Sequence, residues 1–134
     1  MSLKIGIIGA GMMLKYQVEA FRSAGAKVTC IADMNPTAAQ KAASTYNIPI
    51  TYSTLEEMLD KASDQIDAVS ILTPPVSHKM IAVHALQSGK HVFCEKPPAI
   101  NATDVQEMAN AAVAADKHLL FDFNNRLRPE SLEI

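Results

Sequence analysis

Segments with two different patterns of hydrophobic and polar positions alternate from the first residues to about residue 123. Short apolar runs rich in Val and Ile predict β-strands, whereas longer segments with apolar residues three and four apart predict amphipathic helices. The predicted strands are Leu3–Ile8, Val28–Ala32, Ile50–Tyr52, Ala68–Leu72, His91–Cys94 and His118–Phe123. The predicted helices are Met12–Ala24, Thr37–Tyr46, a segment from the capping box at Thr54–Glu57 to about Leu59, Ser77–Ser88 and Thr103–Ala115.

This strict alternation is typical of right-handed βαβ crossovers, which make the strands parallel. The predicted strands are apolar along their whole length, as expected for a sheet that helices cover on both faces. The sequence therefore predicts an α/β fold, a doubly wound parallel sheet in three αβα layers of the Rossmann dinucleotide-binding type. We assign residues 1–123 to this domain, and the polar segment 124–134 to an exit from it.

Composition narrows the classes of partner. The chain has 134 residues, of which 49% are hydrophobic and 19% charged, as in globular domains. The net charge of −2 and the lack of a basic block argue against nucleic acid as the main partner. No apolar run approaches the ~20 residues of a membrane helix and no leader pattern opens the chain, so we expect no membrane partner and a cytoplasmic protein. Cys30 and Cys94 lie far apart, which predicts buried reduced thiols and no metal site.

The sequence Gly9-Ala10-Gly11 separates the first predicted strand from the first helix. The first glycine permits a tight turn, and the second lets the backbone approach a pyrophosphate at the helix N-terminus. We therefore place Gly9, Gly11 and the following Met12 and Met13 in a candidate cofactor site. An ordinary turn would also accept two glycines. The small third residue of such loops is replaced by Leu14, which must push the helix outward or be accommodated by its neighbours.

Asp33 ends the second strand, 22 residues after Gly11. An acidic residue at about this spacing binds the adenosine ribose hydroxyls of a dinucleotide. A carboxylate there repels a 2′-phosphate, and the next residues, Met34 and Asn35, supply no cation, so NAD is favoured over NADP. The alternative is that Asp33 caps the helix that begins near Pro36.

Thr73-Pro74-Pro75 ends the fourth strand, and His78 follows within one helical turn. The prolines make this loop rigid beside the expected cleft. We expect Thr73 and Pro74 to contact the cofactor. His78 lies either near the nicotinamide or at a partly exposed position in the first turn of a helix.

Glu95-Lys96-Pro97 ends the fifth strand. Ligands of open α/β sheets bind beyond the carboxyl ends of the strands. A partly desolvated lysine there can pass a proton or orient a hydroxyl, whereas Glu95 stabilises its charged form. A lysine after a strand is also commonly a solvated surface residue.

In this order, together with Phe123-Asn124-Asn125-Arg126 after the sixth strand, these motifs resemble the Gfo/Idh/MocA oxidoreductases, the family of glucose-fructose oxidoreductase and inositol dehydrogenase. The resemblance covers nearly the whole chain. It implies an NAD(P)-binding domain of an enzyme that transfers hydride between a nicotinamide cofactor and a secondary alcohol of a sugar or cyclitol. It also implies that Lys96 is catalytic, and that Glu95, Lys96, Asn124 and Arg126 belong to the cofactor site.

The resemblance further implies a second, α+β domain that carries the substrate-binding wall, and the chain ends where that domain would begin. We therefore expect the chain to bind NAD weakly, to be inactive alone and to form a homo-oligomer when full length. Departures from the family pattern are Leu14, Pro98, Asn125 and Leu127. The alternative is a non-catalytic NAD-sensing or scaffold module in which Lys96 is a relic.

Overall fold

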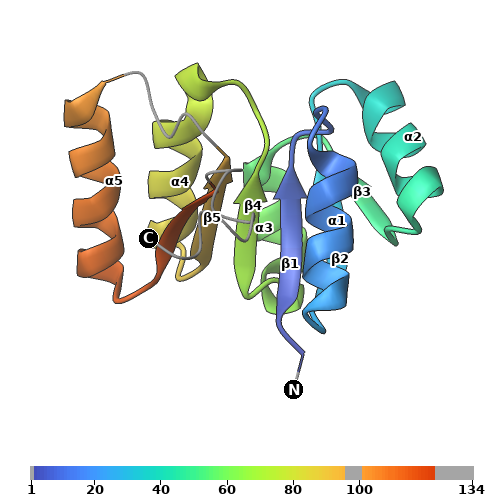
Figure 1. Ribbon diagram of the computed structural model, residues 1–134, viewed down its shortest axis with the longest axis horizontal. Coiled ribbons are helices and arrows are strands. Elements are labelled where there is room, and N and C mark those ends of the chain that lie inside the picture. The colour runs from blue at the N-terminus through green and yellow to red at the C-terminus, as the bar shows by residue number, and fades with distance from the viewer. Residues whose placement is uncertain (1, 96–100, 123–134) are drawn as a thin grey trace, which may run out of the picture.

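The computed structural model describes residues 2–95 and 101–122. These residues form one six-stranded sheet in the order β3-β2-β1-β4-β5-β6, in which every neighbouring pair is parallel (Figure 1). The strands are β1 (Lys4–Ile8), β2 (Lys27–Ala32), β3 (Ile50–Tyr52), β4 (Ala68–Ile71), β5 (His91–Glu95) and β6 (Leu119–Asp122). The helices are α1 (Leu14–Ser23), α2 (Pro36–Tyr46), α3 (Leu55–Ala62), α4 (His78–Gln87) and α5 (Ala102–Ala115), with 3-10 turns at Ser63–Gln65 and Pro75–Ser77.

The hydrophobic core lies in two layers, one on each face of the sheet. Helices α1 and α2 pack on one face, with Leu14 and Val18 against Ile5, Ile7 and other strand residues. The opposite face is covered by α3, α4 and α5, and Figure 1 shows α4 beside α5. The predicted doubly wound sheet with three αβα layers is thereby confirmed.

Element boundaries differ from the sequence predictions mainly at the ends of helices. Helix α1 begins at Leu14 rather than Met12, because residues 12 and 13 form a turn closed by the bond from Leu14 N to Gly11 O (3.1 Å). Helix α3 runs on to Ala62 instead of ending near Leu59. Leu14 is buried among the α1–α2 core residues, so its neighbours accommodate it in place of a small residue.

Both cysteines are buried and free, as predicted. Burial is the main cause that raises the pKa of each thiol, to about 12 for Cys94. Within residues 2–95 and 101–122, no helix is long and apolar enough to cross a membrane.

A histidine pair lies at the amino ends of β5 and β6, far from the carboxyl ends of the strands. The rings of His91 and His118 stack with centroids 5.1 Å apart, and His118 N donates a 3.0 Å hydrogen bond to His91 Nδ1. Burial is the first cause that lowers the pKa of His91, followed by the positive charges of Lys117 and His118, while Asp67 opposes the shift. The neutral form of His91 is therefore the one that fits the folded structure.

The stability of the domain should fall on acidification partly through His91. Its pKa is lower in the folded state than in the unfolded chain, where it is about 6.5. The unfolded state therefore takes up the proton first, so the stabilisation is complete above that pH and is lost as the pH falls below it. Urea unfolding of the wild type and of His91→Gln between pH 8 and pH 5 should show the steeper loss in the wild type.

Gln87→Ala is the control, because Gln87 is exposed at the end of α4 and its side chain carries no titratable group. Its unfolding free energy should keep the wild-type dependence on pH. Equal slopes for the wild type and His91→Gln would contradict this account.

Candidate functional site

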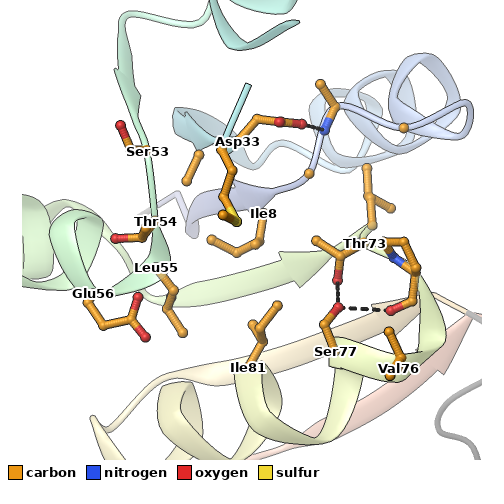
Figure 2. A pocket seen from close by; sticks show the side chains of 17 residues that line it. Ile8, Asp33, Ser53, Thr54, Leu55, Glu56, Thr73, Val76, Ser77 and Ile81 are labelled. Carbon is orange, nitrogen blue, oxygen red and sulfur yellow. Dashed lines mark hydrogen bonds between the residues drawn. The ribbon is translucent and has the colours of Figure 1, made fainter. Parts of the chain in front are cut away.

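A pocket opens at the carboxyl ends of β1, β2 and β4 (Figure 2). Strand β1 lies between β2 and β4, so the chain crosses from one half of the sheet to the other at this place, where open α/β sheets bind their ligands. The cavity of about 530 Å³ is within the usual range for small-molecule sites. Its lining consists of Ile8, Gly9, Ala10, Gly11, Ala32, Asp33, Met34, Ser53, Thr54, Leu55, Glu56, Leu72, Thr73, Pro74, Val76, Ser77 and Ile81.

The backbone packs closely around the glycines of the first loop. Gly9 has φ +99°, and a Cβ there would lie 3.0 Å from the carbonyl carbon of Leu72. A Cβ on Gly11 would lie 3.1 Å from the oxygen of Leu72. The loop therefore sits directly on the end of β4, and its backbone forms one wall of the pocket.

Helix α1 follows this loop, and no side chain caps its N-terminus or places an acid in its first turn. Helix α4 likewise has no side-chain cap, whereas Asn35 caps α2, Thr54 caps α3 and Asn101 caps α5. The partial positive charge of the α1 N-terminus is thus left without a side-chain partner of the usual kind, next to a bare glycine loop. Such an end is suited to an anionic group.

Asp33 fastens the glycine loop to the end of β2. Its Oδ2 accepts a 2.9 Å bond from Ala10 N, visible in Figure 2, and its Oδ1 accepts a 2.8 Å bond from Asn35 N. The predicted alternative, that Asp33 caps the next helix, is wrong. The cap is Asn35, whose Oδ1 accepts bonds from Thr37 N and Ala38 N, because Pro36 occupies the first helical position. The carboxylate of Asp33 is thereby kept at the pocket.

The wall formed by Ser53 to Glu56 was missed as a binding surface in the sequence. The sequence pattern there predicts only a capping box. The structure confirms its cap bond, in which Glu57 N donates to Thr54 Oγ1 (3.1 Å), whereas Glu57 Oε1 accepts from Ser53 N (2.8 Å), one residue before the cap. The Ser53 bond is the main cause that lowers the pKa of Glu57. The missed signal was that this segment follows β3, whose carboxyl end meets those of β1 and β2 at one edge.

The described pocket lining is negatively charged. Asp33 and Glu56 contribute carboxylates, and no Lys, Arg or His is among the lining residues that the structure describes. Outside the lining, His84 Nδ1 lies 3.5 Å from Glu56 Oε1.

The loop after β4 is held by its own hydroxyls. Ser77 Oγ is hydrogen-bonded to Thr73 Oγ1 (2.6 Å) and to the Pro74 carbonyl (2.8 Å), as Figure 2 shows. His78 begins α4 and is only 1% exposed, so the expectation of a partly exposed histidine is wrong. Its Nε2 lies 2.5 Å from the Thr73 carbonyl and donates to it. His78 is outside the described lining, and its contact with a nicotinamide stays a prediction.

Glu95 ends β5 as a buried carboxylate, 9% exposed, whose Oε2 accepts a 3.2 Å bond from Gln17 Nε2. Gln17 was not identified in the sequence.

Met12 is 96% exposed, and neither it nor Met13 lines the pocket.

The remaining predicted site residues, Lys96, Asn124 and Arg126, lie outside the described residues, as does Phe123 of the predicted last strand. Their roles stay predictions. Among residues 2–95 and 101–122, no three His, Cys, Asp or Glu side chains are grouped to hold a metal ion.

Comparison with known proteins identifies the family. A family model described as the oxidoreductase family with an NAD-binding Rossmann fold, Gfo/Idh/MocA, matches residues 3–123. The inositol 2-dehydrogenase/D-chiro-inositol 3-dehydrogenase of Shouchella clausii is 34% identical over 122 residues, which are 90% of this chain and 35% of that protein. The NADP(+)-type scyllo-inositol 2-dehydrogenase of Bacillus subtilis is 40% identical over 88 residues, 66% of this chain and 26% of that protein.

A solved structure agrees with this result. The WlbA dehydrogenase of Bordetella pertussis, in complex with NADH and UDP-GlcNAcA, is 29% identical with a TM-score of 0.90 over 98% of this chain and 39% of that chain. The chain thus spans less than half the length of these relatives. It belongs to the Gfo/Idh/MocA oxidoreductase family and corresponds to its NAD-binding Rossmann domain.

Proposed function

We propose that this chain is the cofactor-binding part of a dehydrogenase that moves a hydride between NAD and a secondary alcohol of a sugar or cyclitol. The observation that carries the proposal is the pocket at the sheet's switch point, where a loop with little room for a Cβ at Gly9 and Gly11 faces the carboxylate of Asp33. These residues fit a dinucleotide. The bare loop and uncapped α1 suit a pyrophosphate, and Asp33 suits ribose hydroxyls.

The role proposed for each residue follows from its position at the pocket or in the sequence. Gly9 and Gly11 admit the phosphates, and the apolar Leu55 with Ser53 and Thr54 forms a wall suited to the adenine. Bound NAD supplies the hydride acceptor. Lys96, next to Glu95, holds or passes the proton of the substrate hydroxyl.

The charges of the pocket favour NAD over NADP. A 2′-phosphate would meet the carboxylates of Asp33 and Glu56, and the described lining offers it no cation. A relative from Bacillus subtilis is named for NADP, so membership of the family does not fix the cofactor. The preference for NAD over NADP is therefore proposed for this chain alone.

Substrate class is inferred from the relatives. They are named for inositols, and the WlbA structure contains a nucleotide sugar, UDP-GlcNAcA, so a ring carrying secondary hydroxyls is the shared chemistry. We further propose that the substrate-binding wall belongs to a second domain, beyond an exit at 124–134, and that the whole protein acts in the cytoplasm as a homo-oligomer. An NAD-sensing module without catalysis is the competing function, and it would bind NAD in the same pocket.

Cofactor choice can be measured with the 134-residue chain. Isothermal titration should give NAD a Kd about tenfold or more below that of NADP, because a phosphate dianion within about 5 Å of a carboxylate is repelled by more than ~1 kcal/mol. Asp33→Asn keeps a side-chain oxygen that can accept a hydrogen bond from a backbone N–H but removes the negative charge. It should therefore bring the Kd for NADP closer to the Kd for NAD.

Asp60→Asn is the control, because Asp60 is exposed on α3 and does not line the pocket. It should leave both Kd values unchanged. Tighter binding of NADP than NAD by the wild type would overturn the assignment of the cofactor.

A second prediction concerns the glycine loop. Gly9→Ala should abolish measurable NAD binding, because its Cβ would press on the end of β4 and shift the loop. Gly25→Ala is the matched control. Gly25 also has a positive φ, +87°, but nothing lies within 4 Å of a Cβ there.

Gly25→Ala should lose roughly 1 kcal/mol of unfolding free energy through backbone strain, and Gly9→Ala should lose more, because its Cβ also presses on the end of β4; urea curves measure both losses. Only Gly9→Ala should lose NAD. Equal Kd values for the two variants would show that the loop does not shape the cofactor site.

A further inference from the structure

Glu56 brings a carboxylate to the pocket from the first turn of α3. Other residues make the capping bonds at this end of the helix: Thr54 Oγ1 accepts from Glu57 N, and Glu57 Oε1 accepts from Ser53 N. Outside the lining, His84 Nδ1 lies 3.5 Å from Glu56 Oε1. The second oxygen, Oε2, has no hydrogen-bond partner among the residues that the structure describes, so it can accept a bond from a ligand.

The spacing of Asp33 and Glu56 suits an adenosine. Strands β2 and β3 end side by side, and Asp33 N donates a 3.1 Å hydrogen bond to Tyr52 O. Neighbouring strands lie about 4.8 Å apart, and one turn of helix rises about 5.4 Å. Glu56 follows the end of β3 by about one such turn, so it lies on the order of 10 Å from Asp33. This is comparable with the length of an adenosine from its ribose hydroxyls to the amino group of its base.

Apolar side chains share the pocket with Glu56. Leu55 is its neighbour in the lining, and both lie on the side of the pocket away from Thr73 (Figure 2). Met34 and Val76 also line the pocket, although they are 84% and 75% exposed. Large apolar side chains that stay exposed in a pocket mark a surface that a ligand covers. A flat aromatic base is suited to such walls, with its polar edge toward the carboxylate.

A carboxylate distinguishes between purine bases by the groups at their position 6. It accepts hydrogen bonds and donates none. Adenine carries an amino group there, which donates, whereas guanine and hypoxanthine carry an oxygen, which only accepts. An oxygen facing the carboxylate of Glu56 would leave both acceptors without a hydrogen bond. The N1–H of a 6-oxopurine points in another direction and reaches the same carboxylate only if the base moves.

We propose that Glu56 is a specificity-determining residue of the pocket: its carboxylate accepts a hydrogen bond from the amino group of adenine and so selects adenine over 6-oxopurine bases. The inference deepens the proposed function and rests on it, because it takes the base of a bound dinucleotide to lie between Asp33 and α3. The side chain of Glu56 is 67% exposed, so water competes for the bond and the effect on the Kd is modest.

Isothermal titration of the 134-residue chain tests this with NAD and nicotinamide hypoxanthine dinucleotide, which differ in the purine base alone. The wild type should bind NAD with a Kd about fivefold lower. Glu56→Gln should bring the ratio of the two Kd values close to one, because its amide can donate to an oxygen as well as accept from an amino group. Glu56→Ala should do the same by removing the acceptor.

The ratio of the two Kd values is the readout, because losing a negative charge near the phosphates changes the binding of both dinucleotides alike. Adenosine and inosine monophosphates should show the same wild-type preference, since neither contains the nicotinamide half. Asp60→Asn is the matched control: Asp60 is exposed on the same helix and does not line the pocket. This variant removes an equal charge and should keep the wild-type ratio.

Equal Kd values of the wild type for the two dinucleotides would overturn the proposal, as would a wild-type ratio in both Glu56 variants. A loss of discrimination in Asp60→Asn as well would assign the effect to the charge of α3 and overturn the role of Glu56. In each of these outcomes the wild type still binds NAD, so the proposed function stands. Absence of NAD binding by the wild type would instead overturn the proposed function and this inference together.

Both Glu56 variants should fold, because the side chain is exposed and makes no capping bond. Urea unfolding of each variant checks this before the titrations.

Discussion

The parallel pairing of all six strands is the constraint on which the rest of this structure depends. It brings the carboxyl ends of all six strands to one edge of the sheet. Residues that are far apart in the sequence therefore lie close together at this edge. Because β1 is central, its loop touches both halves: Asp33 holds it from β2, and Leu72 supports it from β4. The pocket is the space between these three strand ends and the N-terminal parts of α3 and α4.

Within that edge, backbone donors fix the acidic groups in place. Asp33 accepts two backbone N–H bonds, and Glu57 accepts one from Ser53. Glu95, farther along the edge, is held by the side-chain amide of Gln17. These donors orient the carboxylates that they hold. The pocket thus combines a backbone loop at the uncapped N-terminus of α1 with a lining that carries the carboxylates of Asp33 and Glu56.

Much of the fold was predictable from the sequence. The periods that mark strands and helices depend on neighbouring residues, and the strand order of a doubly wound sheet follows from the right-handed crossovers. The errors have physical causes. The aspartate at residue 33 and the asparagine at 35 both suit a cap, and only the position of Pro36 decides between them. The burial of His78 depends on the short turn Pro75–Ser77, which sets the first residue of α4 against the Thr73 carbonyl. The periodicity places Gln17 in the core but does not reveal its partner, 78 residues away.

The leucine at residue 14 shows how a departure from a family pattern can be absorbed. A small residue there lets the first helix approach β1 closely, yet Leu14 is buried beside Ile5 and Ile7, and the glycine loop still lies against β4. The turn at residues 12 and 13 delays the start of α1, which leaves Met12 96% exposed and turns Leu14 into the core. The backbone of the loop, rather than the third small residue, therefore sets the distance between α1 and the pocket. In this chain the close contact between the loop and β4 lies at Gly9 and Gly11, where a Cβ would come within 3.1 Å of Leu72.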